Sequence, residues 1–210
     1  MSATLQFGLE PFDRALDDIR RYCGLPWSGG PPEVFAYHYF DALPERREDD
    51  EVRPVDVLAA GTLHPGLSKA DLTYFVEARH QLREELAALP TGVDLGDAPR
   101  EVVNRVLTLG ERVQPACGLS LLSKVLHHKR PRLVPMLDRA LTDTYRPFSG
   151  ERGAKAWRPC VGLLQRDLAI EENRKALSEI QRTLASELGA TPPSELRLAD
   201  IAIWMGASNR

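Results

Sequence analysis

The sequence predicts an all-α protein, a single compact helical domain over residues 1–210 with at most one short strand. Three observations support this prediction. Apolar residues recur at every third or fourth position along most of the chain, which is the period of an amphipathic helix. Segments in which apolar and polar residues alternate are nearly absent. A chain of 210 residues, of which 43% are hydrophobic, is long enough to bury one core.

The first half of the chain contains four predicted helices and one ambiguous segment. A helix is expected over residues 11–23, where Gly24 ends it. Residues 34–40, VFAYHYF, are rich in aromatic residues and fit either a short strand or a buried helical turn. Ser68 and Asp71 form an S-x-x-D capping pattern, which is typical of a helix start. The other helices of this half are expected over residues 54–63, 68–89 and 99–110.

The second half is organised around a helical hairpin at residues 114–147. Its first helix follows Gly118, and Pro135 restarts the chain as the first turn of the second helix, with Asp138 just inside it. Residues 148–160 are expected to form a basic loop. Further helices are expected over residues 161–168, from there to 188, and after Ser194. The predicted core includes Leu121, Val125, Leu177, Ile180, Leu184, Ile201 and Trp204.

The charge of the chain is unevenly distributed. The net charge is −3, but residues 112–158 carry ten basic and three acidic side chains, a balance of +7. Such asymmetry favours a polyanion-facing side, although a solvated basic surface is the simpler interpretation. Three widely spaced cysteines argue against a disulfide framework and fit a cytoplasmic protein. No metal-binding motif, cofactor motif, secretory signal or apolar run of membrane-spanning length is found in the sequence.

The first helix of the hairpin has an apolar and a polar face. Its polar side chains, spaced so that they share one face, are Ser120, Ser123, Lys124 and His127. The helix N-terminus, with its free amides and positive dipole end, favours an anion. The basic side chains that follow are Lys129, Arg130 and Arg132. The hairpin therefore indicates either a solvated basic surface or a clamp for phosphates beside a catalytic carboxylate.

This hairpin resembles that of the helix-hairpin-helix DNA glycosylase superfamily. The matching pieces are Gly118-Leu119-Ser120, the run KRPRLVP at 129–135, and Asp138. The resemblance implies that backbone amides of the hairpin bind a phosphate and that Asp138 supports cleavage of the glycosidic bond of a flipped base. Leu122 stands where lyase-type members carry a catalytic lysine, and Lys124 is expected on the opposite face. The same stretch is similar to that of small actinobacterial proteins of unknown function.

Two classes of function follow from these patterns. The first is a DNA-binding protein, with duplex DNA as partner, that acts as a monofunctional glycosylase with Asp138 as its catalytic carboxylate. The second is a non-catalytic interaction or regulatory protein that docks its basic hairpin on an acidic partner. The candidate DNA contacts are Gly118, Ser120, Ser123, Lys124, His127, Lys129, Arg130 and Arg132. Tyr145 and Trp157 are candidates for stacking on a base, with core packing as the alternative.

Overall fold

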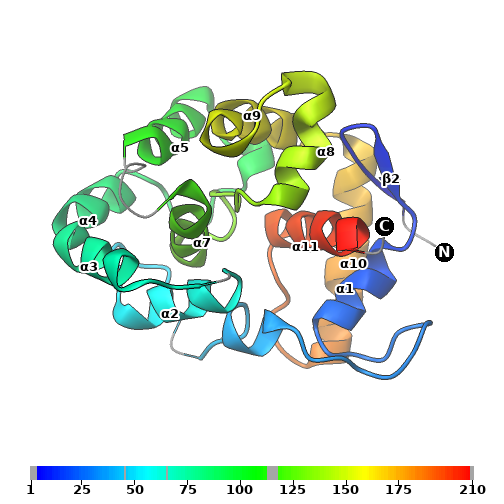
Figure 1. The fold of residues 1–210 in the computed structure, drawn as a ribbon. Helices are drawn as coiled ribbons and strands as arrows, with labels where there is room; N and C mark the ends of the chain where they lie inside the picture. Colours follow the sequence, from blue (N-terminus) through cyan, green and yellow to red (C-terminus); the bar gives the residue numbers. More distant parts are fainter. Residues whose placement is uncertain (1–3, 45, 65, 113–117, 209–210) are drawn as a thin grey trace.

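The computed structural model describes residues 4–44, 46–64, 66–112 and 118–208. Most of these residues are helical, and the predicted all-α class is confirmed (Figure 1). The helices of the first half are α1 (Ala15–Tyr22), α2 (Pro54–Thr62), α3 (Lys69–Glu77), α4 (Arg79–Ala87) and α5 (Arg100–Arg112). Those of the second half are α7 (Leu119–Lys129), α8 (Arg139–Ser149), α9 (Trp157–Leu168), α10 (Glu171–Leu188) and α11 (Glu195–Ser208). The 3₁₀ helices are η1 (Ala36–Tyr39), η2 (Leu95–Asp97) and η3 (Gly153–Ala156).

The N-terminal segment forms a small antiparallel hairpin that the sequence did not predict. Its strands are β1 (Leu5–Phe7) and β2 (Glu10–Phe12), with Leu5 opposite Phe12. Gly8 has φ +62°, a left-handed conformation that glycine adopts without strain in a tight turn. The helix expected from residue 11 therefore begins only at Ala15. Alternate residues of β1 are buried, which is the period of a strand rather than a helix.

The ambiguous aromatic segment 34–40 is not a strand. It contains η1, in which Tyr37 is buried, and Phe40 follows in the core. Of the two forms that the sequence allowed, strand or helical turn, the segment adopts the helical turn. It places aromatic rings beside the central helices without a sheet partner.

The long helix expected over residues 68–89 is divided into α3 and α4 at Ala78. Its predicted start is confirmed, because the amide of Asp71 donates to Ser68 Oγ at 3.2 Å and the amide of Ser68 donates to Asp71 Oδ2 at 2.8 Å. The bend changes which residues face inward. Leu72 and Val76 are exposed, whereas Phe75, Leu82, Leu86 and Leu89 are buried.

Two further boundaries differ from the prediction. Residues 130–138 are not helical, so Pro135 does not begin a helix, and α8 begins at Arg139 with Asp138 as its N-cap. The expected basic loop at 148–160 instead contains the end of α8, η3 and the first turn of α9. The first of these differences places Asp138 at a helix terminus, where its carboxylate accepts from the backbone amide of Leu141.

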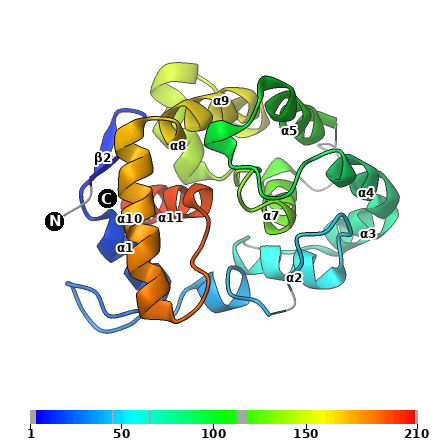
Figure 2. The ribbon, with the colours of Figure 1, turned by 180° about the vertical axis from the view of Figure 1, so that it is seen from behind.

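Helix α11 lies at the centre of the C-terminal half and packs against α1, α8 and α10. Figure 1 shows α11 surrounded by these helices, and Figure 2, seen from behind, shows α10 crossing in front of it. Helix α7 packs against α2 and α5, which come from the N-terminal half of the chain, and α9 contacts both α5 and α8. The predicted core residues are buried except Trp204, which is 36% exposed. The two halves meet where α7, α11 and the segment 130–138 approach one another.

Candidate functional site

The polar face of α7 is turned inward, toward the non-helical segment 130–138. Ser123 Oγ accepts the amide of Leu137 at 2.9 Å. The Nδ1–H of His127 donates to the carbonyl of Val134 at 2.7 Å. Burial holds the pKa of His127 well below its usual value, so this ring is neutral. The side chains that were expected to meet a phosphate on the surface instead fix the segment that leads to Asp138.

A pocket of about 380 Å³ opens where these elements meet. Its walls come from the end of α1, the start of η1, the end of α2, α7, residues 136–138 and α11. They are formed by Tyr22, Phe35, Ala36, Thr62, Leu63, His64, Lys124, Met136, Asp138, Arg197, Asp200, Ile201 and Trp204. The pocket is thus assembled from segments spread over most of the chain.

Lys124 and Asp138 line this pocket together. Lys124 Nζ donates to Ser120 Oγ at 2.9 Å and to the carbonyl of Ser120 at 3.3 Å. Burial lowers the pKa of Lys124, and the Asp138 carboxylate partly offsets that shift. Asp138 Oδ1 accepts the amide of Leu141 at 2.8 Å, which fixes the carboxylate at the start of α8. The two side chains line one pocket because the chain between them folds back along α7.

One side of the pocket is aromatic. The rings of Tyr22 and Phe35 stack with centroids 6.0 Å apart, and Trp204 meets both of them edge-on at 6.3 and 5.9 Å. Trp204 is only half-buried because it borders the pocket, which explains its departure from the predicted core. Such a surface suits a planar apolar ligand face.

Two charged residues of α11 belong to the pocket and were not predicted. Arg197 donates from Nε to Asp41 Oδ1 at 2.7 Å, from one terminal nitrogen to the Tyr22 hydroxyl at 2.5 Å, and from the other to Asp200. Burial raises the pKa of Asp200 to about 7, and the nearby Asp138 carboxylate also raises it, while Arg197 and Lys124 lower it. Their signal in the sequence was a charged pair spaced i, i+3 within an otherwise apolar helix.

The basic residues at the end of α7 are buried in ion pairs. Lys129 is 0% exposed and lies 2.7 Å from Asp49 and 3.4 Å from Asp56. The Nδ1–H of His128 donates to Asp56 Oδ1 at 2.7 Å. The prediction that Lys129 is exposed and contacts a phosphate is therefore wrong. Two carboxylates bind its amine instead, that of Asp49 before α2 and that of Asp56 in α2.

The next two basic residues are also engaged within the protein. Arg130 is buried, pairs with Asp50, and donates to the backbone carbonyls of Leu86 and Leu89 at 2.7 and 3.1 Å. Arg132 is exposed, but its Nε donates to Asp94 at 2.9 Å. These arginines tie the end of α7 to α4 and to the turn before η2.

Tyr145 and Trp157 belong to the core and do not line the pocket. The Tyr145 hydroxyl donates to Asp167 Oδ2 at 3.1 Å, and Trp157 Nε1 donates to the carbonyl of Leu107 at 3.1 Å. Both side chains are fully buried. The base-stacking prediction is wrong for both residues, and the core-packing alternative describes them.

A second cavity, of about 610 Å³, adjoins the pocket and shares Asp138 with it. It runs along α8 from Arg139 to Arg146 and includes Gly118 and Ser120 from the start of α7. We call it the arginine groove, because three arginines line it: Arg139, Arg146 and Arg152. Arg139 projects into solvent with its side chain 94% exposed. The exposed positive charge of this region thus comes from α8 and the turn after it, not from α7.

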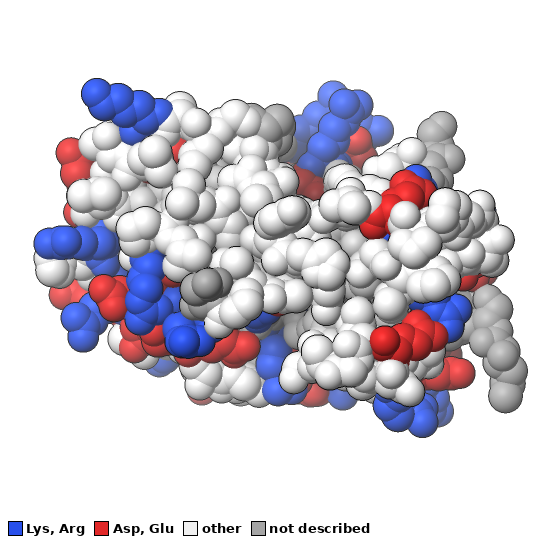
Figure 3. Space-filling view, turned by 90° about the horizontal axis from the view of Figure 1, so that it is seen from below, with Lys and Arg blue, Asp and Glu red and all other residues white. Residues whose placement is uncertain are grey.

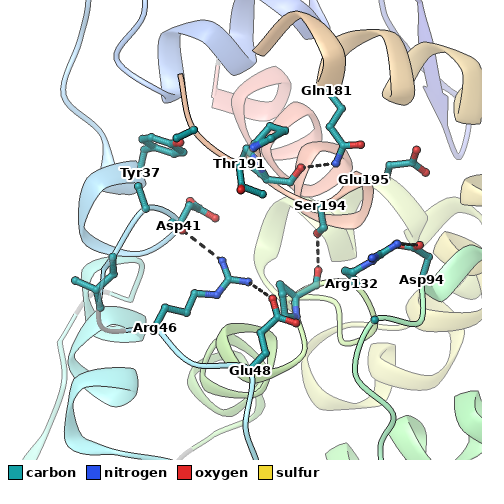
Figure 4. Close-up of a pocket in the computed structure, with 17 residues that line it drawn as sticks. Tyr37, Asp41, Arg46, Glu48, Asp94, Arg132, Gln181, Thr191, Ser194 and Glu195 are labelled. Carbon is teal, nitrogen blue, oxygen red and sulfur yellow. Dashed lines mark hydrogen bonds and ion pairs between the residues drawn. The ribbon is translucent and has the colours of Figure 1, made fainter. Parts of the chain in front are cut away.

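A larger groove, of about 750 Å³, lies between segment 37–48 and the connection from α10 to α11 (Figure 4). Most of its polar side chains bind other parts of the groove wall. Arg46 donates to Glu48 at 3.4 Å, and Ser194 Oγ donates to a backbone carbonyl at 2.6 Å, as Figure 4 shows. Because the smaller pocket instead brings a buried amine and two carboxylates together, it is the candidate site.

Other features of the described residues bear on the kind of site. The face in Figure 3 has uncharged residues in its middle and charges of both signs around its margin. Within the described ranges, no cluster of three histidines, cysteines or acidic residues could hold a metal ion. Among the helices that the structure describes, none combines the length and apolar character needed to cross a membrane.

Comparisons with known proteins give a family but no function. Neither a curated protein nor a solved structure matches the chain. A family model described as "Family of unknown function (DUF6308)" matches residues 15–207, nearly the whole sequence. The chain belongs to this DUF6308 family.

Proposed function

We propose that the protein is an enzyme that cleaves the N-glycosidic bond of a single nucleotide in a nucleic acid strand, with Lys124 as the nucleophile. One observation carries the proposal. Lys124 and Asp138 line the aromatic pocket, and Asp138 also lines the arginine groove beside it. A nucleotide with its base in the pocket and its phosphate in the groove would place its sugar at these two side chains.

The pocket has the size and the walls that one flipped base needs. Ligand pockets are typically about 300–1,000 Å³ and mostly apolar with a few polar groups, and this one has about 380 Å³. Enzymes that act on a base take it out of the stack and hold it against aromatic or apolar side chains. Tyr22, Phe35 and Trp204 offer such a surface.

The arginine groove supports a strand rather than a free nucleoside as substrate. Arg139, Arg146 and Arg152 lie along it, and guanidinium groups bind phosphate oxygens with matching geometry. Gly118 and Leu119, at the start of α7, line the same groove, and a helix N-terminus favours an anion. Asp143 pairs with Arg139 and Arg146 at 3.3 and 3.2 Å, and a phosphate would compete for these exposed pairs.

The chemistry follows from the environment of Lys124. Burial lowers its pKa, so its neutral and nucleophilic form is more populated than in a solvated lysine. The Lys124 nitrogen forms a bond to C1′ while the C1′–N bond breaks and its electron pair leaves on the base. Asp138 accepts the proton that the amine then loses and returns it to O4′ as the sugar ring opens to an iminium. Water hydrolyses the iminium and frees Lys124.

This mechanism differs from the one that the sequence favoured, in which Asp138 positions water and no amine takes part. The amine mechanism is supported by the place of Lys124 in the pocket lining, although Leu122 stands where lyase-type helix-hairpin-helix glycosylases carry a lysine. Leu122 is fully buried in the core. The amine therefore comes from a position two residues later on the same helix.

The test is covalent trapping with a duplex DNA that contains one abasic site. Borohydride reduces an iminium to a stable amine, so the wild-type protein should form a protein–DNA adduct that is visible on a denaturing gel. Lys124→Met should abolish the adduct, because it keeps an unbranched apolar stem and removes the amine. Lys175→Met removes an exposed lysine on α10 and is the matched control. Equal trapping by the wild type and Lys124→Met would refute the proposal.

A further inference from the structure

The pocket contains a third ionisable group that the amine mechanism does not use. Asp200 lies on α11, one helical turn before Trp204, and lines the same pocket as Lys124 and Asp138. Only one of its carboxyl oxygens is engaged. Oδ2 accepts from Arg197, whereas no residue that the structure describes forms a hydrogen bond with Oδ1. One carboxyl oxygen of this buried, pocket-lining residue thus remains for a ligand.

Arg197 fixes the orientation of this carboxyl group. It also binds Asp41 through two nitrogens, at 2.7 and 3.0 Å, and the Tyr22 hydroxyl at 2.5 Å. Because Asp41 already compensates the guanidinium charge, Arg197 does not require a second ionised carboxylate. Asp200 is therefore held in one orientation while its protonation state stays adjustable.

The charges around Asp200 oppose one another. Arg197 on its own helix and Lys124 on α7 favour its ionised form, while Asp138 and Asp41 favour its protonated form. Burial is the largest influence, and together these raise the pKa of Asp200 to about 7. Tyr22 on α1 and His64 after α2 are the other titratable side chains that line the pocket. Burial raises the pKa of Tyr22 and lowers that of His64, so both are uncharged at neutral pH.

We propose that Asp200 is the general acid that protonates the departing base, an inference that rests on the proposed function. The base leaves C1′ with the electron pair of the broken C–N bond and would be an anion without a proton. The carboxyl proton of Asp200 passes to a ring nitrogen or oxygen of that base, which departs neutral and leaves Asp200 ionised. Solvent then returns the proton to Asp200 before the next cycle.

This role defines the substrate class. A base that is neutral in the strand needs a proton in order to leave, whereas a base that is already cationic, such as 7-methylguanine, leaves neutral without one. General acid catalysis typically contributes about 10²–10⁴-fold to a rate. The structure therefore assigns the enzyme to neutral bases, and Asp200 should be dispensable for a cationic one.

The experiment compares single-turnover base release from duplexes that differ in one base. The neutral panel contains hypoxanthine, uracil and 8-oxoguanine, and the cationic probe is 7-methylguanine. Asp200→Asn keeps an oxygen for Arg197 but supplies no acid, so release of the neutral base should fall about 10²-fold. Two activities of the variant should stay within about threefold of the wild type: release of 7-methylguanine and borohydride trapping on an abasic duplex. Their retention also shows that the variant is folded. With the wild type, the rate should fall above about pH 7 for the neutral base only.

Each outcome separates the two proposals. No trapping of the abasic duplex by the wild type would overturn the proposed function, and the role of Asp200 with it. Trapping without release of any base would overturn glycosidic cleavage and the role of Asp200 with it, whereas release of 7-methylguanine alone would overturn only the role of Asp200. An equal loss for neutral and cationic bases in Asp200→Asn would also overturn it, because that pattern indicates a structural residue.

Discussion

Asp56→Asn tests the buried ion-pair network that fastens α7 to α2. Asp56 is 1% exposed, and each of its oxygens is engaged. Oδ1 accepts from His128 at 2.7 Å, and Oδ2 accepts the amide of Arg53 at 2.7 Å and lies 3.4 Å from Lys129 Nζ. Asparagine has nearly the same shape but no charge, and it has one acceptor oxygen instead of two. The substitution therefore leaves Lys129 buried with a single carboxylate, that of Asp49.

The expected loss of folding stability can be worked out from these contacts. Removing one partner of a buried ion pair costs about 3–5 kcal/mol, because the other charge stays buried. Asp49 still contacts Lys129 at 2.7 Å, so the lower end, about 3 kcal/mol, is expected. For a chain of this length 1 kcal/mol shifts Tm by about 2–4 °C, which gives a decrease of about 6–12 °C.

The loss should also depend on pH. Burial acts to raise the pKa of Asp56, but the hydrogen bond from His128, the amide of Arg53 and the charge of Lys129 together hold it below the ordinary value of 3.8. A carboxyl group with a lowered pKa stabilises the folded state above its unfolded pKa and loses that effect as the pH falls through its folded pKa. The difference in the free energy of unfolding between the wild type and Asp56→Asn should therefore be largest at pH 7 and should decrease below about pH 4.

Urea unfolding followed by circular dichroism at pH 7 and pH 3.5 measures both effects. Asp143→Asn is the matched control, because it removes an exposed carboxylate and should change stability by less than about 0.5 kcal/mol. Adding Lys129→Met to Asp56→Asn should recover part of the loss, since no buried charge then lacks its partner. A change below about 1 kcal/mol for Asp56→Asn at pH 7 would refute the reasoning.

Three further predictions follow from burial and charge. Leu184→Ala should destabilise by roughly 2–5 kcal/mol in calorimetry, because the side chain is fully buried, and a change below about 1 kcal/mol would contradict its place in the core. If Arg139, Arg146 and Arg152 each bind a phosphate, the log–log salt slope for duplex DNA binding should be roughly −2.7, and Arg152→Ala should bring it to roughly −1.8; an unchanged slope in the variant would remove Arg152 from the contact. Trp204→Ala should weaken binding of a base-containing duplex by about tenfold but leave trapping of an abasic duplex intact, and equal loss of both would show that Trp204 does not stack on the base.

The periodicity of α7 predicted which of its residues share a face but not what that face contacts. Ser120, Ser123, Lys124 and His127 do lie on one side of the helix, as their spacing indicates. The sequence interpretation assigned this side to solvent because it is polar. The structure covers it with residues 130–138, whose amides and carbonyls need partners because they form no helix of their own. A polar helix face can therefore serve an irregular segment of the same chain.

The rest of the site depends on contacts between distant parts of the chain, which no local pattern contains. Asp138 was predicted from its motif. Arg197 and Asp200 were not predicted as site residues, because they belong to a helix that was correctly predicted to be buried. Their charges are tolerated because Tyr22 and Asp41 lie beside them. Likewise, the excess of basic residues at 112–158 predicted a charged surface, although five carboxylates from elsewhere in the chain bind several of them.

The hydrogen bond from Arg197 to Tyr22 joins residues 175 positions apart and has a consequence for folding. Closing so long a loop costs conformational entropy before any contact offsets it, which slows folding when such contacts dominate a structure. Neighbouring helices such as α3 and α4 can form local contacts early, but the pocket gains its α11 side only when α11 packs against α1. Partly folded chains would therefore have helical content and no intact pocket, so activity should return later than the circular dichroism signal during refolding.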